Sequence, residues 1–268
     1  MSAADPGGRI RRVAVALDAS PHSLQGLTLA AGIAAALNAE LEGVFVEDTE
    51  LLRLAGLPFL RELRIATLCE SALDAERLER ELRAAARGVR ERLERTASEL
   101  GVVSSFRVWR GDLEAEILGA GLDAELFALG RIGRFAPLRR RPRPIVPKHR
   151  GGGLLVGVLY SGSEGATRAL SIAVELGIRH AASLVVILQP ATRADAATLR
   201  NRVLEQLGTL REQTRLVSLE ATDAAGLAAT VRNLGMDLLI LDETNPLLAR
   251  TSLWSSLETL GCPVAIGR

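Results

Sequence analysis

Polar residues and glycines that could bind a ligand stand directly after apolar runs of this sequence. Asp18 follows the run Val13–Leu17, where it is either a ligand contact or a helix-entry residue that accepts hydrogen bonds from nearby amides. Gly130 ends the segment Glu125–Gly130, and Gly133 follows three residues later. A lone Gly-x-x-Gly is typical of a turn. These glycines therefore indicate a site only if the surrounding elements place them at one.

The sequence contains no pattern typical of a catalytic centre. The motifs GxSxG, HExxH and GxxxxGK[ST] do not occur in its 268 residues. Asp242 and Glu243 could suggest acid–base chemistry, but neighbouring residues of a strand point to opposite faces and would not share a site. We therefore expect a protein that is not an enzyme.

Histidine and cysteine are too scattered to form a metal site. His22, His149 and His180 lie far apart, and Cys69 and Cys262 have no Cys or His at ligand spacing. This spacing predicts neither a zinc site nor a disulfide framework, so a reducing compartment is expected.

The elements that must position these residues repeat along the chain. An apolar run opens each half, at Arg12–Ser20 and at Leu154–Ser163, and a helix rich in small residues follows it. In the first half we expect strands at Val13–Leu17, Leu41–Val46, Ser105–Trp109 and Glu125–Gly130, and helices from Ser23 to about Leu37, from Asp74 to about Leu100 and at Leu113–Gly121. In the second half we expect strands at Leu154–Leu159, Ser183–Gln189, Arg215–Glu220, Met236–Asp242 and Pro263–Gly267, and helices at Ser163–Leu176, Ala194–Gln213, Ala224–Leu234 and Leu247–Leu260. The alternation predicts an α/β fold with two doubly wound, Rossmann-like parallel-sheet domains in tandem, which bind ligands at the carboxyl ends of their strands.

The joint between the halves has an unusual composition. Arg131–Gly153 holds four prolines, a triple glycine and eight Arg or Lys residues. Proline lacks an amide donor, so this segment cannot be a regular helix or a central strand. It stands where the second half has Leu247–Gly267. We therefore expect a first domain at residues 9–133 that has lost its last helix and strand, a linker at 134–153 and a second domain at 154–268.

Composition narrows the function classes. Hydrophobic residues make up 48% of the chain and aromatic residues only 3%, which suits helices packed on a buried parallel sheet. The net charge of +1 excludes a globally basic nucleic-acid binder, and the run Arg139–Arg141 lacks interleaved aromatic residues for base stacking. The apolar segment Leu27–Leu37 is about half of the roughly 20 residues that a membrane span needs. We expect a cytoplasmic protein without membrane or nucleic-acid partners.

Taken in order, these features resemble a tandem universal stress protein. A strand ends in Asp18-Ala19-Ser20, the strand Glu42–Val46 and a long charged helix follow, a later strand ends in Gly130-x-x-Gly133, and Gly261–Ile266 (GCPVAI) closes the chain. The resemblance extends from Arg11 to Arg268 and depends on the order of the features. It implies two domains of the adenine-nucleotide alpha hydrolase-like type and a role in the stress response.

The resemblance also implies a nucleotide site in the first half. In nucleotide-binding members of that family, an acid after the first strand meets adenine and ribose, and a Gly-x-x-Gly turn with a later Gly-Ser/Thr wraps the phosphates. The residues that carry over as nucleotide-binding candidates are Asp18, Ser20, Val46, Gly130, Arg131, Gly133 and Arg134. Where Gly-Ser is expected, however, the chain has Arg143-Pro144, so the outer half of the phosphate site is missing. The candidate cofactor is ATP or another adenine nucleotide, bound weakly.

The second half departs further from the family's pattern. Ser161 stands where the acid would be, and Asp242-Glu243-Thr244-Asn245 stands in place of the Gly-x-x-Gly turn. Two carboxylates facing a triphosphate would repel it. We expect no ATP binding in this half.

Two segments are candidates for protein contacts. In relatives the terminal strand mediates pairing, which implies that Val264, Ala265 and Ile266 join the two halves or form a homodimer. The apolar segment Leu51–Leu63, with Leu57 and Phe59, is either core or lid, or a patch that binds a partner or a second subunit.

The preferred function is a non-catalytic stress-response or regulatory protein that acts through contacts with an unknown regulatory partner. The alternative is an ATP-binding switch in which the Arg-rich linker closes over the phosphates. The third candidate function is an enzyme that processes a nucleotide.

Overall fold

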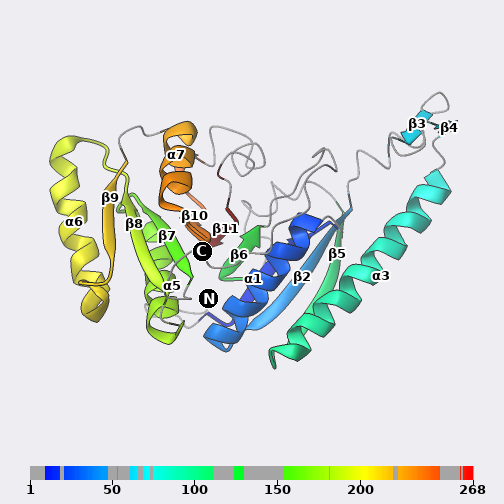
Figure 1. Cartoon of the computed structure of the whole chain (residues 1–268), viewed down its shortest axis with the longest axis horizontal. Coiled ribbons are helices and arrows are strands. Elements are labelled where there is room, and N and C mark those ends of the chain that lie inside the picture. The colour runs from blue at the N-terminus through cyan, green and yellow to red at the C-terminus, as the bar shows by residue number, and fades with distance from the viewer. Residues whose placement is uncertain are drawn as a thin grey trace, which may run out of the picture.

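The computed structural model of the chain describes residues 10–18, 21–47, 53, 61–64, 69–72, 75–110, 124–129, 154–180, 182–219, 223–247, 260 and 262–267. In it, nine strands form one sheet in the order β5-β2-β1-β6-β11-β10-β7-β8-β9 (Figure 1). Their bounds are β1 Arg12–Leu17, β2 Glu40–Glu47, β5 Ser104–Arg110, β6 Leu126–Leu129, β7 Leu155–Tyr160, β8 Ser183–Leu188, β9 Arg215–Ser218, β10 Leu238–Asp242 and β11 Val264–Gly267. Neighbouring strands run parallel except β6 and β11. The predicted α/β fold with a mainly parallel sheet is confirmed.

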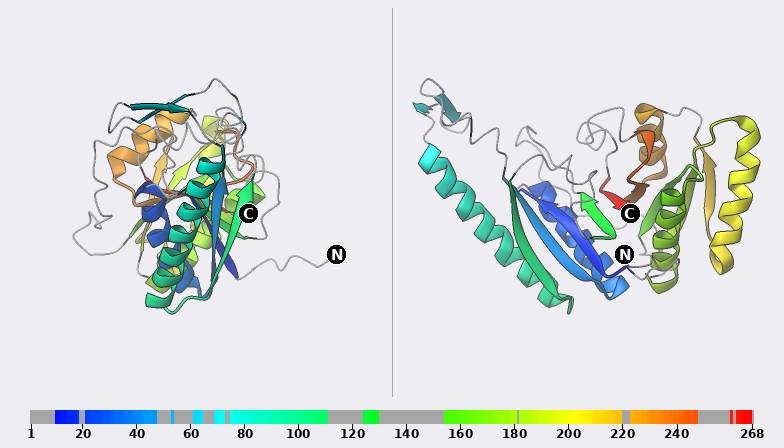
Figure 2. Two further views of the ribbon diagram at one scale, coloured as in Figure 1. Left: turned by 90° about the vertical axis from the view of Figure 1, so that its right-hand side faces the viewer. Right: turned by 180° about the vertical axis from the view of Figure 1, so that it is seen from behind.

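Helices pack on both faces of this sheet. They are α1 Pro21–Leu37, α3 Ala75–Glu99, α5 Glu164–His180, α6 Arg193–Leu207 and α7 Ala224–Leu234, with the 3₁₀ turn η1 at Gly208–Leu210. Side chains of α1, α3, α5 and α6 share one hydrophobic cluster, and those of α7 belong to the cluster on the other face. Figures 1 and 2 show the sheet running across the molecule, with α3 and β5 at one end and α6 and β9 at the other.

The bounds of three helices differ clearly from the sequence prediction. Helix α6 ends at Leu207 and passes into η1, whereas the sequence predicted a helix to Gln213. Helix α1 begins at Pro21 rather than after Ser23, because proline is well suited to the first turn of a helix, where its missing amide costs nothing. Helix α5 continues through Gly177 to His180. A Cβ at Gly177 would lie 2.9 Å from Leu210 Cδ1 and 3.2 Å from Leu184 Cδ1. Close packing against η1 and β8 therefore explains this glycine better than the predicted helix stop.

A small hairpin was not expected from the sequence. Strands β3 (Arg61–Arg64) and β4 (Cys69–Ala72) pair antiparallel outside the main sheet, next to the N-terminal end of α3 (Figures 1 and 2). The hairpin follows most of the segment Leu51–Leu63. Leu57 and Phe59 lie outside the described residues, as do the predicted helix Leu113–Gly121 and the linker at 134–153.

The two halves of the sheet meet at β6 and β11. Val264 of β11 is opposite Leu129, and Gly267 is opposite Leu126, in an antiparallel ladder. On its other side β11 runs parallel to β10. The segment Val264–Ile266 is buried here and joins two parts of one chain. Both edges of β11 are therefore occupied, and a homodimer, which stays a prediction, would need another surface.

The core is continuous across this junction. One hydrophobic cluster contains Val15 and Leu27 of the first half together with Val158 and Leu170 of the second, and helices α1 and α5 contact one another. None of the helices that the structure describes is long and apolar enough to cross a membrane.

Candidate functional site

The carboxyl ends of the parallel strands are the first candidate site, because side chains from several strands meet there. In the second half, β7 is followed by Ser161, Gly162 and Ser163, and α5 begins at Glu164. Gly162 has a φ of 86°, and a Cβ there would lie 2.5 Å from Leu199 Cδ2, so the tight turn requires glycine. The hydroxyl of Ser163 accepts a hydrogen bond from the Ala166 amide at 2.9 Å and caps the helix.

Ser161 takes part in this turn. Its Oγ lies 3.2 Å from Ser163 Oγ and accepts a 3.4 Å hydrogen bond from the Ser163 amide. The residue that replaces the acid of the first half is thus engaged in the entry to α5.

Asp242, the last residue of β10, lies beneath the same helix entry. Its side chain is fully buried, and its Oδ1 accepts hydrogen bonds from the Thr244 amide at 3.1 Å and the Thr244 hydroxyl at 2.6 Å. A Cβ on Gly165, in the first turn of α5, would lie 3.0 Å from Asp242 Oδ1. A carboxylate here is favoured by the positive end of the helix dipole, and it occupies the region an anionic ligand would otherwise use.

Asn245 connects the carboxyl end of β10 to Gln189, which follows β8. It is buried, its Nδ2 donates to Gln189 Oε1 at 3.0 Å and its Oδ1 accepts from the Leu247 amide at 3.0 Å. Asp242, Thr244, Asn245 and Gln189 are joined by hydrogen bonds, and together with the separate serine turn at the start of α5 we call them the β10 polar network. Asp242 Oδ1 is hydrogen-bonded to Thr244, whereas Asp242 Oδ2 is buried without a hydrogen-bond partner among the described residues.

Thr244→Val tests the strength of this network. The change removes the hydroxyl that donates to the buried Asp242 carboxylate, and hydrogen bonds to charged groups contribute roughly 1.5–3 kcal/mol. Because Thr244 is exposed, we expect a loss near the lower end, about 1.5 kcal/mol, in the free energy of unfolding measured with urea. Thr209→Val, at an exposed position of η1, is the control and should change it by less than about 0.5 kcal/mol. Equal effects would show that the network does not stabilise the fold.

In the first half, the structure brings two of the predicted nucleotide residues to the equivalent edge. Asp18 follows Leu17, which is paired in register with Phe45, so Asp18 lies beside Val46 on β2. Both side chains are half-buried. Ser20, Gly130, Arg131, Gly133 and Arg134 lie outside the described residues. The structure therefore places part of the predicted site at one edge and says nothing of its phosphate side.

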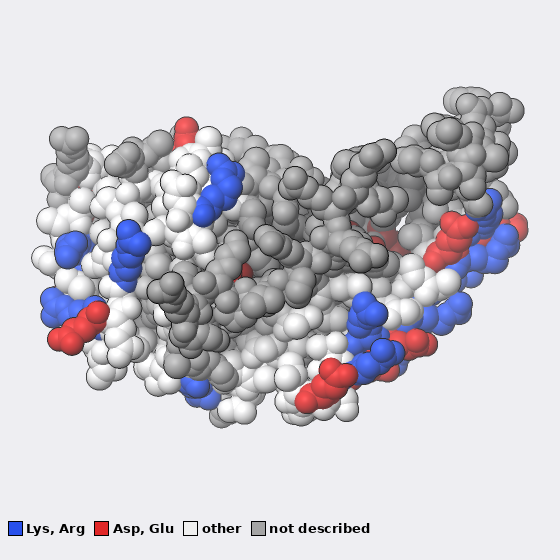
Figure 3. Space-filling model, in the orientation of Figure 1, with Lys and Arg blue, Asp and Glu red and all other residues white. Residues whose placement is uncertain are grey.

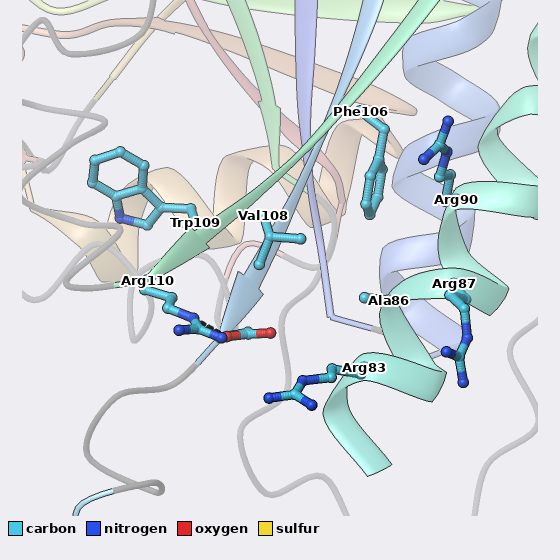
Figure 4. Close-up of a pocket in the computed structure, with 9 residues that line it drawn as sticks. Arg83, Ala86, Arg87, Arg90, Phe106, Val108, Trp109 and Arg110 are labelled. Atoms are coloured by element: carbon cyan, nitrogen blue, oxygen red, sulfur yellow. Dashed lines mark hydrogen bonds and ion pairs between the residues drawn. The ribbon is translucent and has the colours of Figure 1, made fainter. Parts of the chain in front are cut away.

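A second candidate, which the sequence analysis missed, lies at the outer end of the sheet. Glu47 ends β2 and is buried, and its Oε2 lies 2.5 Å from Nε of Arg110 at the end of β5. Next to this ion pair is a hollow between β5 and α3 with a volume of about 640 Å³ (Figure 4). The spacing of Arg83, Arg87 and Arg90 on the helix was a signal present in the sequence, but only the structure shows what they face.

The described residues were also searched for a metal site. No group of three or more His, Cys, Asp or Glu side chains among these residues could hold a metal ion.

Comparison with known proteins finds similarity in structure but not in sequence. No family model and no curated protein matches this sequence. A universal stress protein from Archaeoglobus fulgidus DSM 4304 has a similar structure, with a TM-score of 0.60, 14% sequence identity and 96% of each chain covered. A putative universal stress protein from Pseudomonas aeruginosa UCBPP-PA14 matches with a TM-score of 0.48 and 14% identity over 98% of this chain and 94% of the other. From the similarity to the Archaeoglobus protein, the described part of the chain has the α/β fold of a universal stress protein.

Proposed function

We propose that this protein is a non-catalytic, cytoplasmic regulator of the universal stress type, which acts through protein contacts and binds at most one adenine nucleotide, weakly, in its first half. The fold shared with the Archaeoglobus protein supports the type. The observation that carries the proposal is the difference between the two carboxyl edges of the sheet. In the second half, the β10 polar network with its buried Asp242 fills the edge.

The chemistry of that network favours a structural role for the second half. Asp242 is an acceptor, and so is a phosphate, so the two would repel each other at the entry of α5. The Ser163 hydroxyl already accepts the hydrogen bond of the Ala166 amide, a donor that a phosphate would otherwise use. At the first-half edge, by contrast, Asp18 is half-buried beside Val46. We therefore assign any nucleotide to Asp18.

A thermal-shift experiment tests this assignment. The melting temperature is measured with and without millimolar ATP, ADP and AMP in the presence of magnesium. A ligand at 100 times its dissociation constant stabilises the native state by about 2.7 kcal/mol, so even micromolar affinity produces a clear upward shift. We expect Asp18→Ala to abolish the shift and Ser161→Ala to leave it unchanged.

The matched pair of variants separates the outcomes. Equal loss of the shift in Asp18→Ala and Ser161→Ala would contradict the one-site proposal. No shift of the unaltered protein with any nucleotide would leave a regulator that works through protein contacts alone. Steady formation of ADP from ATP above a protein-free control, followed by chromatography, would contradict the non-catalytic part of the proposal.

A further inference from the structure

The hollow between α3 and β5 has two chemically different sides. Helix α3 contributes Arg83, Ala86, Arg87 and Arg90, and the strands contribute Glu47, Phe106, Val108, Trp109 and Arg110. Its volume of about 640 Å³ falls within the range of roughly 300–1,000 Å³ that is usual for small-molecule sites. It lies at the outer end of the sheet, away from the β10 polar network (Figure 1).

The floor of the hollow is apolar. Phe106, Val108 and Arg110 alternate along β5 and so share one face of the strand, the face turned toward α3, whereas Trp109 points to the other side (Figure 4). Val108 is 43% exposed although it lies on the face of β5 that is turned toward α3, and Ala86 of α3, which also lines the hollow, is buried. The exposed apolar surface gains free energy if an apolar group covers it.

The rim of the hollow carries arginines on its helix side. Arg83, Arg87 and Arg90 recur at intervals of four and three residues and therefore lie on one side of α3. Arg83 pairs with Glu79 at 2.7 Å and Arg90 with Glu94 at 2.8 Å, and all four side chains are about half exposed. Such pairs along a helix contribute only a few tenths of a kcal/mol, so a bound anion can replace them. Arg87 forms no ion pair with any residue that the structure describes.

The strand side of the rim is electrically balanced. The Arg110 guanidinium is held by Glu47, whose side chain is only 5% exposed. Positive charge available to a ligand is therefore concentrated on α3, while both acidic and basic side chains cover the rest of that helix (Figure 3). A ligand would place its charged group toward the helix and its apolar part over Phe106 and Val108.

We propose that this hollow is a binding site for an amphipathic organic anion, a molecule with one carboxylate, phosphate or sulfonate group on an apolar chain or ring. A bare inorganic anion would leave the floor exposed, and a neutral apolar molecule would leave the arginines unused. Guanidinium groups bind carboxylate and phosphate oxygens in bidentate fashion, which suits such a head group. The proposal does not depend on the nucleotide assignment at Asp18.

Binding of 8-anilinonaphthalene-1-sulfonate tests the proposal, because this dye is an aromatic sulfonate that fluoresces in apolar surroundings. We expect saturable binding to the full-length protein and at least tenfold weaker binding to R83A/R87A/R90A. The control R80A/R92A/R95A removes the same charge from the same helix at positions that do not line the hollow, and should bind the dye normally. Both triple variants add only alanine, the best helix former, and their melting temperatures establish that they are folded.

Competition distinguishes the chemical classes. Dodecanoate, below its critical micelle concentration, should displace the dye, whereas sulfate or dodecanol at the same concentration should not. Displacement by sulfate alone would reduce the hollow to a simple anion site and overturn the proposal. Displacement by an acidic peptide but not by dodecanoate would assign the surface to a protein partner instead. Equal dye affinity in the two triple variants, or no binding to the unaltered protein, would also overturn it.

Discussion

Ile266→Ala is expected to lower the free energy of unfolding by about 2–5 kcal/mol, the usual cost of truncating a fully buried isoleucine. Ile266 is completely buried in β11, opposite Phe127 of β6 on one side and beside Leu241 of β10 on the other. The substitution therefore weakens the strand that joins both halves of the sheet. Urea unfolding gives the size of the loss.

Amide hydrogen exchange shows which strands are destabilised by the substitution. Ile187 is also fully buried, in the same hydrophobic cluster, but β8 lies between β7 and β9 within the second half. We expect Ile187→Ala to destabilise the protein by a similar amount. Only Ile266→Ala should speed exchange in β6 and β1 beyond the change in global stability. Identical exchange profiles for the two variants would show that the junction has no separate role.

Leu93→Ala and Gly43→Ala are expected to destabilise the protein separately and to compensate each other in part. A Cβ on Gly43 of β2 would lie 2.6 Å from Cδ2 of Leu93, a fully buried residue of α3. Adding this carbon overpacks the contact, which costs roughly 1–3 kcal/mol, and removing the leucine side chain leaves a cavity, which costs roughly 2–5 kcal/mol. In the double variant the new methyl group occupies part of that cavity.

A double-mutant cycle measured by urea unfolding checks this contact. We expect the double variant to be more stable than the sum of the single losses predicts, by about 0.5–3 kcal/mol. Gly88→Ala is the control, because a Cβ at Gly88 of α3 would meet nothing within 4 Å. It should stabilise the protein by up to about 1 kcal/mol and add to Leu93→Ala without coupling. Strict additivity of Gly43→Ala and Leu93→Ala would contradict the packing of α3 on β2.

Local signals in the sequence predicted much of the fold. Helix α7 has the predicted bounds, Ala224–Leu234, and the structure shows local signals at both of its ends. Asp223 accepts a hydrogen bond from the Gly226 amide at 2.7 Å, and Gly235 adopts a φ of 66° that ends the helix. The buried strands, which are short continuous apolar runs, were likewise recognisable.

Contacts between distant residues could not be predicted in the same way. The sequence predicts that helix α5 ends at Leu176, before Gly177, but the role of this glycine depends on Leu184 and Leu210, which come later in the chain. The hydrogen bond between Asn245 and Gln189 joins the ends of two strands, so the sequence indicated the carboxylates of the second half but not the network around them. The exposed floor at Val108 depends on how far α3 lies from β5, which no local pattern encodes.

The junction of β6 and β11 has a consequence for how this protein emerges from the ribosome. Leu129 and its ladder partner Val264 are separated by about 135 residues, so β6 leaves the exit tunnel long before the strand that covers its edge has been made. At roughly 5–20 residues per second, the wait is about 7–27 s. Throughout this interval the nascent first half exposes an unpaired, hydrophobic sheet edge, which is a site for aggregation or for a chaperone. A strand made about 135 residues later therefore completes the sheet edge of the half that was made earlier.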